Sequence, residues 1–485
     1  MPNINDSLRR SVTANVVGRY SNILIQLLVT GVLARTLDPR DFGLMAIVSI
    51  LAVFLSFLSE MGLGPAIIQF RDLTVAQLAG LFWITICVGI VAGYAFAISG
   101  PWIAAAYRTP VYVRISEGMG LTIALSCWAI VPLALMRRSQ RFKAIAAIEV
   151  GSAVLSGACA VVAALHGWGV HALVIKSASN ALFFFVFCMC LGCPVLSIRP
   201  TPKGMRHVLS YSTYQFLFNV LNYFTRNLDK LLIGRFLGAA PLGLYDMSYR
   251  LMLMPVTNLT HVITPALQPV YAAHGGELDT VFSAYQKLVR FLVIAGGLLG
   301  LLCLVCSDEI ISIAYGHKWQ GAAAIFSVLS LSIAVQVVLS STGSVFQALG
   351  RTDLLFKTGL ISTLTTVVAV IIGIWERDVV LLSWLLVGGF FINAVQGFHI
   401  LSRQGFGRSA IELFRPVMPM LVGIALLSYL GIMLRHVGAD GQSMPLFRLV
   451  TKAVAVCICY ATLACVTGDA AFLRKALTVR RRAAA

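Results

Sequence analysis

Long hydrophobic runs, separated by short polar segments, make up almost the whole chain. Fourteen of these runs are long enough to cross a bilayer as a helix of about 20 residues. They cover residues 14–35, 42–60, 77–99, 116–136, 144–165, 169–194, 209–237, 243–267, 287–307, 322–347, 355–375, 378–401, 416–434 and 447–468. The pattern predicts an all-α integral membrane protein with about fourteen transmembrane helices.

The composition supports this class of protein. Of the 485 residues, 59% are hydrophobic and 12% are charged, whereas soluble domains carry about 25% charged residues. The longest predicted loop, residues 269–286, has no room for a soluble catalytic module. We therefore expect no enzyme activity, no catalytic residues and no cofactor. The 11 cysteines lie mostly in apolar runs without histidines at ligand spacing, so we expect no metal site.

The basic residues are divided unequally between alternate loops. About 22 Lys and Arg lie on the side of the N-terminus and about 9 on the other side. Because cytoplasmic loops carry the excess of positive charge, this division predicts that both termini are cytoplasmic. Much of the net charge of +18 then faces the cytoplasm and anionic lipid headgroups, so a nucleic-acid partner is not needed to explain it.

An internal repeat relates the two halves of the chain. At an offset of 200 residues, Arg35-Thr36-Leu37 matches Arg235-Phe236-Leu237, and Phe42-Gly43-Leu44 matches Leu242-Gly243-Leu244. Further along the offset becomes 214, where Phe142-Lys143 matches Phe356-Lys357. Repeats of six spans are parallel, and transporters built from them bind substrate between the halves. We predict bundles at 1–195 and 209–401, a cytoplasmic linker at 196–208, and two extra helices with a basic tail at 402–485.

The seventh run carries three charged residues near its middle, Arg226, Asp229 and Lys230. Each costs about 2.5–3.5 kcal/mol at the centre of an isolated membrane helix. Their helical spacing places all three on roughly one side, facing either protein or a water-filled cavity. The same run holds Asn222, and the equivalent first run has polar residues at similar depth. These are Arg19, Asn22 and Gln26.

The eighth run adds Asp246 and Arg250 at i and i+4, a spacing that predicts a local ion pair. A cavity lined by these cations would bind an anion, and phosphate suits guanidinium groups best. Asp229 and Asp246 would balance the cations or bind a coupling ion. Three further charged residues, Glu149, Lys176 and Lys452, either face the cavity or lie near helix ends. The remaining acidic residue of interest, Glu60, is explained by a plain helix terminus.

Two motifs resemble one known family. The stretch GVLARTLDPRDFGLMAIVSILAVFLSFLSEMGLGPAII is similar to the start of Wzx-type polysaccharide flippases, of the multidrug/oligosaccharidyl-lipid/polysaccharide exporter superfamily. The stretch YFTRNLDKLLIGRFLGAAPLGLYDMSYRL resembles that family's seventh and eighth spans. The resemblance covers nearly the whole chain. It implies two six-helix bundles in a V around a central cavity, in the bacterial inner membrane.

The resemblance also implies the substrate. It indicates translocation of undecaprenyl-pyrophosphate-linked oligosaccharide units before polymerisation, for exopolysaccharide or lipopolysaccharide synthesis. The implied partners are this lipid-linked oligosaccharide and membrane lipids, with a polysaccharide polymerase and export machinery as further candidates. By position, the resemblance assigns the cationic cavity to Arg226, Asp229 and Lys230, with Arg19 and Arg250 as weaker matches.

Two other functions remain open. A cation-coupled multidrug exporter of the same superfamily would need an acidic, aromatic cavity, whereas the predicted cavity has more cations than carboxylates. A membrane polymerase or glycosyltransferase would need paired carboxylates in a loop, and the longest loop offers only Glu277 and Asp279. The glycan, the coupling ion and the oligomeric state are not determined by the sequence.

Overall fold

The structure is a computed structural model that describes residues 4–60, 63–69, 73–192, 213–273, 278–434, 444–472 and 474. These residues form helices joined by short turns, and no strand occurs among them. By the contacts between its elements the chain divides into two units, residues 1–243 and 244–485. The predicted bundle boundaries at 195 and 209 stay a prediction.

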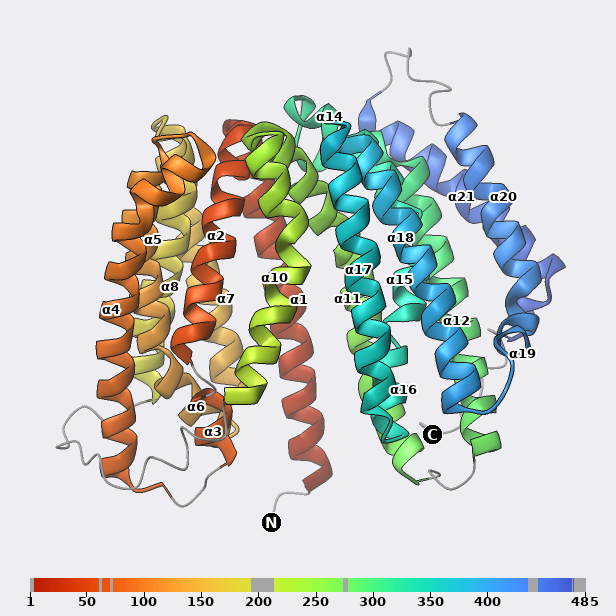
Figure 1. The fold of residues 1–485 in the computed structure, drawn as a ribbon, viewed down its shortest axis with the longest axis horizontal. Coiled ribbons are helices and arrows are strands. Elements are labelled where there is room, and N and C mark those ends of the chain that lie inside the picture. The colour runs from red at the N-terminus through yellow and green to blue at the C-terminus, as the bar shows by residue number, and fades with distance from the viewer. Residues whose placement is uncertain are drawn as a thin grey trace. The chain divides into compact units, whose positions relative to one another are not determined.

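The first unit contains nine helices within the described residues (Figure 1). They are α1 (Ile4–Thr36), α2 (Pro39–Glu60), α3 (Leu63–Gln69), α4 (Val75–Tyr107), α5 (Tyr112–Trp128), α6 (Ile130–Arg138), α7 (Phe142–Leu165), α8 (Val170–Gly192) and α10 (Thr213–Phe236). Helix α4 packs along α5, α7 packs along both α8 and α1, and α10 packs on α2. Helix α11 (Ala239–Ala273) begins at the end of this unit and continues into the second.

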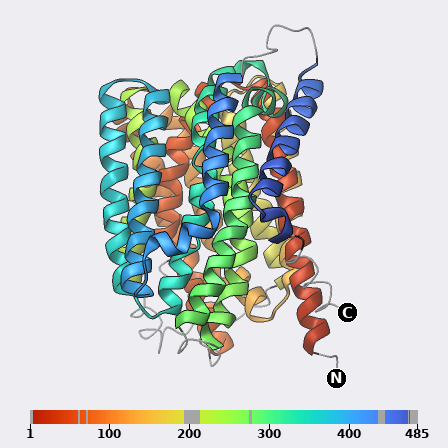
Figure 2. The same ribbon diagram turned by 90° about the vertical axis from the view of Figure 1, so that its right-hand side faces the viewer.

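The second unit is also built from long helices linked by short ones (Figure 2). The long ones are α12 (Leu278–Val305), α17 (Thr352–Trp375), α18 (Val379–Ile400), α20 (Met418–Leu434) and α21 (Pro445–Val466). Shorter elements are α13 (Ser307–Ala314), η2 (His317–Trp319), α14 (Gln320–Ser330), α15 (Ile333–Leu339), α16 (Thr342–Ala348), η3 (Leu401–Gly405), α19 (Ala410–Phe414) and η4 (Arg415–Val417). Helix α17 packs on α18, and α12 contacts α14, α15, α20 and α21.

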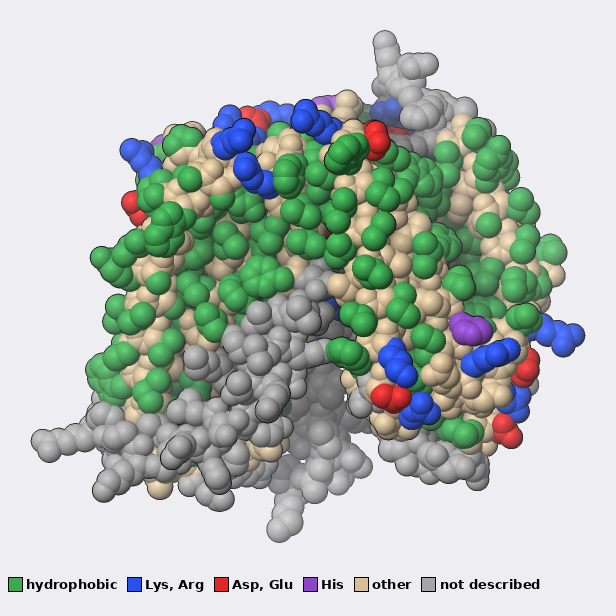
Figure 3. Space-filling view, viewed as in Figure 1, with side chains coloured by type: hydrophobic (Ala, Val, Ile, Leu, Met, Phe, Trp, Pro, Cys, Tyr) green, Lys and Arg blue, Asp and Glu red, His purple; other side chains and the backbone are tan. Residues whose placement is uncertain are grey.

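The described part of every predicted span is helical, but the count of fourteen membrane-spanning helices stays a prediction. Ten helical segments of the described chain are long and apolar enough to cross a membrane, and the bent segment 317–347, with its 49° break, makes up to eleven. Helices α1, α10 and α11 are not among them, and parts of their side chains lie outside the described residues. On the face of the second unit in Figure 3, hydrophobic side chains cover the helix sides and charged ones gather near the helix ends.

One predicted loop is mostly helix. The segment 269–286 was expected to be the longest loop, but α11 continues to Ala273 and α12 already begins at Leu278. Polar residues such as Asp279 lie in the first turn of α12, where an acidic side chain is favoured by the helix dipole. Arg408, which follows η3, pairs with Asp279 at 2.7 Å. At the start of α12 the polarity of this segment therefore marks an exposed helix end.

Local sequence explains where several helices begin and how closely they pack. Thr74 caps α4 in a capping box with Gln77, and Asp378 caps α18 by accepting from two backbone N–H groups. Gly93 of α4 and Gly120 of α5 face each other, and a Cβ on either would overlap the carbonyl oxygen of the other. Small residues thus bring these two membrane helices into backbone contact.

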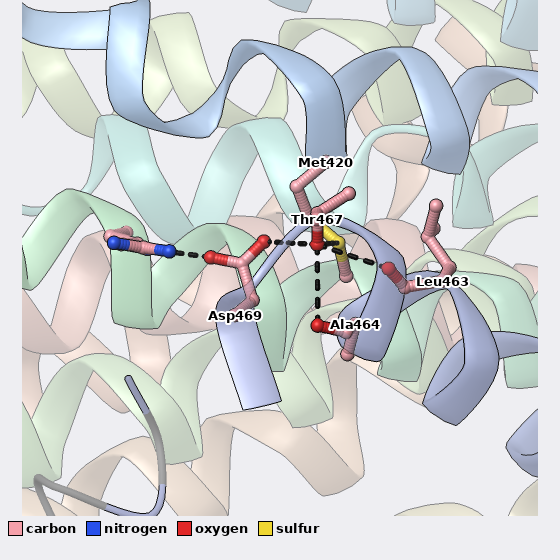
Figure 4. A network of polar contacts seen from close by, with 6 residues as sticks. Met420, Leu463, Ala464, Thr467 and Asp469 are labelled. Atoms are coloured by element: carbon pink, nitrogen blue, oxygen red, sulfur yellow. Dashed lines mark hydrogen bonds and ion pairs between the residues drawn. The ribbon is translucent and has the colours of Figure 1, made fainter. Parts of the chain in front are cut away.

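A buried polar network holds the last helices of the second unit together (Figure 4). Asp469, 1% exposed, follows α21 and accepts hydrogen bonds from Arg290 of α12 at 2.5 Å and from Thr467 at 2.6 Å. In the same unit, Lys452 of α21 pairs with Glu309 of α13 at 2.8 Å, and both side chains are largely buried. These two ion pairs fix α21 against the core of its unit.

Candidate functional site

Helix α10, which carries the predicted cationic residues, is anchored to α2 by an aromatic cluster. The hydroxyl of Tyr223 donates to the carbonyl oxygen of Ile50 at 2.8 Å. The Tyr223 ring lies 5.9 Å from that of Phe57, and the rings of Phe54 and Phe224 are 4.6 Å apart. These contacts determine which face of α10 packs against α2, and therefore where its charged residues point.

The three charges of α10 differ in exposure. Asp229 is buried at 7% exposure, Lys230 is half-buried and Arg226 is exposed. The spacing alone had placed all three on roughly one side. Arg226 and Asp229 are three residues apart and so differ by about 60° around the helix axis. This difference separates the buried Asp229 from the exposed Arg226. The formal charge of the three side chains together is +1, because one carboxylate stands beside two cations.

The polar residues predicted on α1 are only partly assembled. Gln26 donates to the side chain of Asn22 at 3.3 Å, as their i and i+4 spacing allows. Arg19 is exposed. The side chain of Asn222 lies outside the described residues.

The predicted ion pair of α11 is present. Nε of Arg250 lies 2.7 Å from the carboxylate of Asp246, which is 3% exposed, while the Arg250 side chain is 60% exposed. Tyr315, in the turn after α13, interacts electrostatically with both charges. Burial raises the pKa of this phenol to about 12, so it stays protonated at neutral pH. The sequence did not predict the contact of Tyr315, because this residue is far along the chain from Asp246 and Arg250 and no sequence pattern links them.

The predicted site residues thus belong to two different units. Arg19, Arg226, Asp229 and Lys230 lie in the first unit, and the Asp246–Arg250 pair lies in the second. Their assembly around one central cavity stays a prediction.

The first unit contains a cavity of its own, of about 550 Å³. It lies among α2, α3, α5, α6 and α8, and its polar lining consists of Ser56, Glu60, Thr122, Ser126, Arg137, Ser177 and Asn180. Phe57 and Phe184 contribute aromatic rings, and the rest is largely aliphatic. Its volume lies within the range of about 300–1,000 Å³ that is typical of small-molecule sites.

Sequence reasoning missed this cavity. Glu60 was interpreted as a plain helix terminus, and it is the last residue of α2, yet it lines the cavity together with Arg137 at the end of α6. A weak signal was available, because polar Ser56 and Glu60 recur at i and i+4 in a mostly apolar helix. Gly64, in the next helix, leaves room for the carboxylate, since a Cβ there would lie 2.8 Å from Oε1 of Glu60.

The charged residues whose position was left open have different surroundings. Lys452 is not among the residues that line this cavity. Its ammonium group is paired with the carboxylate of Glu309. Glu149 and Lys176 are half-buried in α7 and α8 and do not line the 550 Å³ cavity. Within the described residues no group of three His, Cys, Asp or Glu could hold a metal ion.

These helices, with charged groups on several of them, define a multi-pass helical membrane protein. Residues 32–324 match the model of the polysaccharide biosynthesis protein family, and the chain belongs to that family. The predicted resemblance to polysaccharide flippases is thereby confirmed.

Relatives of known name match most of the chain. The lipopolysaccharide biosynthesis protein WzxC of Escherichia coli K12 is 26% identical over 83% of both chains. The teichuronic acid biosynthesis protein TuaB of Bacillus subtilis is 24% identical, over 73% of this chain and 74% of its own. The succinoglycan biosynthesis transport protein ExoT of Rhizobium meliloti is 22% identical, over 99% of this chain and 97% of its own.

Solved structures share the fold. The lipid II flippase MurJ, in an inward closed conformation, superposes with a TM-score of 0.71 at 10% identity, covering 93% of this chain and 98% of its own. An inward-facing multidrug resistance transporter of the MATE family, in the MOP superfamily, gives a TM-score of 0.59 at 13% identity, covering 78% of this chain and 93% of its own. At such identities the likeness concerns the fold alone.

Proposed function

We propose that this protein is a flippase that moves undecaprenyl-pyrophosphate-linked oligosaccharide units across the bacterial inner membrane. Family membership and relatives named for polysaccharide synthesis or transport support the proposal. The observation that carries it is the charge set of α10. Arg226, Asp229 and Lys230 lie within two turns of a helix that Tyr223 anchors to α2.

The chemistry of the substrate explains why such charges are useful. Moving sugars and a pyrophosphate through hydrocarbon strips their water, which is prohibitive without replacement hydrogen bonds. Arg226, Lys230, Arg19 and Arg250 would supply them to the pyrophosphate, with Asn22, Gln26 and Asn222 as neutral polar lining. The lipid tail would stay in the bilayer. Asp229 and Asp246 would offset the cations, so that the anion is held weakly enough to be released.

The mechanism that we propose is alternating access without bond breaking. Two six-span halves, 1–195 and 209–401, would rock about a central cavity, with two added helices after residue 401. In this arrangement the protein has fourteen spans and both termini lie in the cytoplasm. The lipid-linked oligosaccharide unit on the outer face would then pass to a polymerase. Because no bond is made or broken, no catalytic residue is required.

The test is export of the host polysaccharide in cells that carry variants. Replacing both cations, Arg226→Ala with Lys230→Ala, should abolish surface polymer and accumulate the lipid-linked unit in the inner leaflet. Arg226→Lys should restore export partly, because it returns the charge but not the bidentate guanidinium. Arg235→Ala is the matched control, since it removes an exposed cation from the last turn of the same helix. Normal surface polymer in the double variant would disprove the assignment of the pyrophosphate site.

A further inference from the structure

The cavity of the first unit has features that the proposed pyrophosphate site does not use. None of its lining residues is among the cations of α1, α10 or α11. Its two charged side chains, Glu60 and Arg137, have opposite sign and come from α2 and α6. Arg137 also interacts electrostatically with Glu149 of α7. A cavity that contains one carboxylate and one guanidinium offers both an acceptor and donors.

The hydroxyl groups of the cavity make the lining rich in acceptors. Each of them already donates its proton to a carbonyl oxygen of its own helix. Ser56 donates to the carbonyl oxygen of Ala52 at 3.0 Å, and Thr122 to that of Gly118 at 3.4 Å. Ser126 donates to the carbonyl oxygen of Thr122 at 2.8 Å, and Ser177 to that of Leu173 at 3.2 Å. Their remaining capacity towards the cavity is therefore the oxygen lone pairs. Together with the Glu60 carboxylate, they are suited to a ligand that carries several donors.

This lining disfavours an anion. A phosphate group offers only acceptors to a wall of lone pairs, and the Glu60 carboxylate would repel it. A bare metal cation is equally unsuited, because a space of about 550 Å³ is far larger than an ion and also contains Arg137. A ligand with several adjacent hydroxyl groups can donate to the oxygens and accept from Arg137 and the Asn180 amide. The rings of Phe57 and Phe184 then offer apolar faces to carbon-bound hydrogens.

We propose that this cavity binds one saccharide unit of the transported glycan, through its hydroxyl groups. The inference rests on the proposed flippase function, and it adds a sugar-binding subsite inside the first unit, separate from the cations assigned to the pyrophosphate. Glu60 and Arg137 position the hydroxyl groups, while Asn180 can both donate and accept. The subsite makes the first unit selective for the glycan rather than for the lipid carrier.

Direct binding to the full-length protein tests this inference. The protein is placed in phospholipid nanodiscs, because maltoside detergents would themselves present a sugar. The probes are the methyl glycosides of glucose, galactose, mannose and N-acetylglucosamine, followed by saturation-transfer NMR. At least one should bind to the wild type. Glu60→Gln and Asn180→Leu should each weaken it about tenfold, the size expected when a hydrogen bond to a charged or buried polar group is lost.

A pair of neighbouring substitutions separates binding from folding. Ala181→Phe places a ring in the cavity and should abolish glycoside binding, whereas Leu182→Phe changes the next residue, which is exposed and does not line the cavity. Both variants should keep the thermal unfolding temperature of the wild type. Unaltered binding in Ala181→Phe, or no binding of any glycoside to the wild type, would overturn the inference.

The outcome is independent of the test of the proposed function. A wild-type protein that exports polymer but binds none of the glycosides would disprove the sugar subsite alone. If the variant that lacks both Arg226 and Lys230 exports normally, the pyrophosphate site is disproved, whatever the glycosides do.

Discussion

Gly43 and Gly243, which are 200 residues apart in the chain, lie against each other in the first unit. A Cβ on Gly43 would overlap the carbonyl oxygen of Ala239, and a Cβ on Gly243 would overlap that of Pro39. The two contacts are reciprocal, since Pro39 and Ala239 are also 200 residues apart. When two related helices meet with their first turns at a two-fold axis, their contacts are reciprocal in this way. The full repeat stays a prediction.

This contact predicts the effect of adding one methyl group. Gly43→Ala should lower the free energy of unfolding by about 1–3 kcal/mol, because the obstructing atom is a backbone carbonyl that cannot rotate away. Gly388→Ala in α18 is the control, since nothing lies within 4 Å of its added Cβ. That control should be neutral or slightly stabilising. Thermal unfolding in the same detergent measures both, and equal unfolding temperatures would refute the close approach.

A second prediction concerns the role of Asp229. Asp229→Asn keeps the shape of the side chain and removes the charge that offsets Arg226 and Lys230. We expect transport to fall several-fold while its dependence on pH and sodium gradients is unchanged, because the carboxylate balances charge rather than carrying a coupling ion. Transport into inverted vesicles, with each gradient imposed in turn, measures this. If the variant lost its response to one gradient, Asp229 would instead be the binding site of that ion.

The predicted membrane topology can be tested by labelling. Single cysteines replace four residues that the structure shows to be exposed, in a background without the native cysteines. An impermeant thiol reagent added to whole cells should label Ala240→Cys and Glu376→Cys. Ser139→Cys and Ser409→Cys should react only after the cells are opened, because their loops carry the basic excess. The reverse pattern would place both termini outside the cytoplasm.

The buried network of α12 and α21 should matter for stability. Asp469→Ala leaves the Arg290 guanidinium without its buried partner, and breaking such a pair costs about 3–5 kcal/mol. The apparent unfolding temperature should therefore fall clearly. Asp353→Ala breaks an exposed pair with Arg351, which solvent screens, while the Arg351 guanidinium still donates to the carbonyl oxygen of Gln404. It should change the unfolding temperature little. Similar effects of the two substitutions would contradict the burial of Asp469.

The sequence by itself determined the class of the protein and the position of its helices. The described part of every predicted span is helical, because backbone groups in hydrocarbon must be satisfied internally. Ten or eleven of these segments are long and apolar enough to cross a membrane, and the count of fourteen stays a prediction. The i and i+4 spacing of Asp246 and Arg250 was also sufficient to predict their ion pair. Neighbouring turns of one helix bring the two side chains together, whatever the helix packs against.

Only the tertiary structure decided which helix faces meet. Helices such as α4, α7 and α20 are apolar on all sides, so their patterns do not indicate which face is packed. The pairing of Lys452 with Glu309, and the gathering of Glu60, Arg137 and Asn180 around one cavity, join segments that are distant in the chain. Their contacts depend on the packing of whole helices against one another. The spacing of residues within a single helix does not predict that packing.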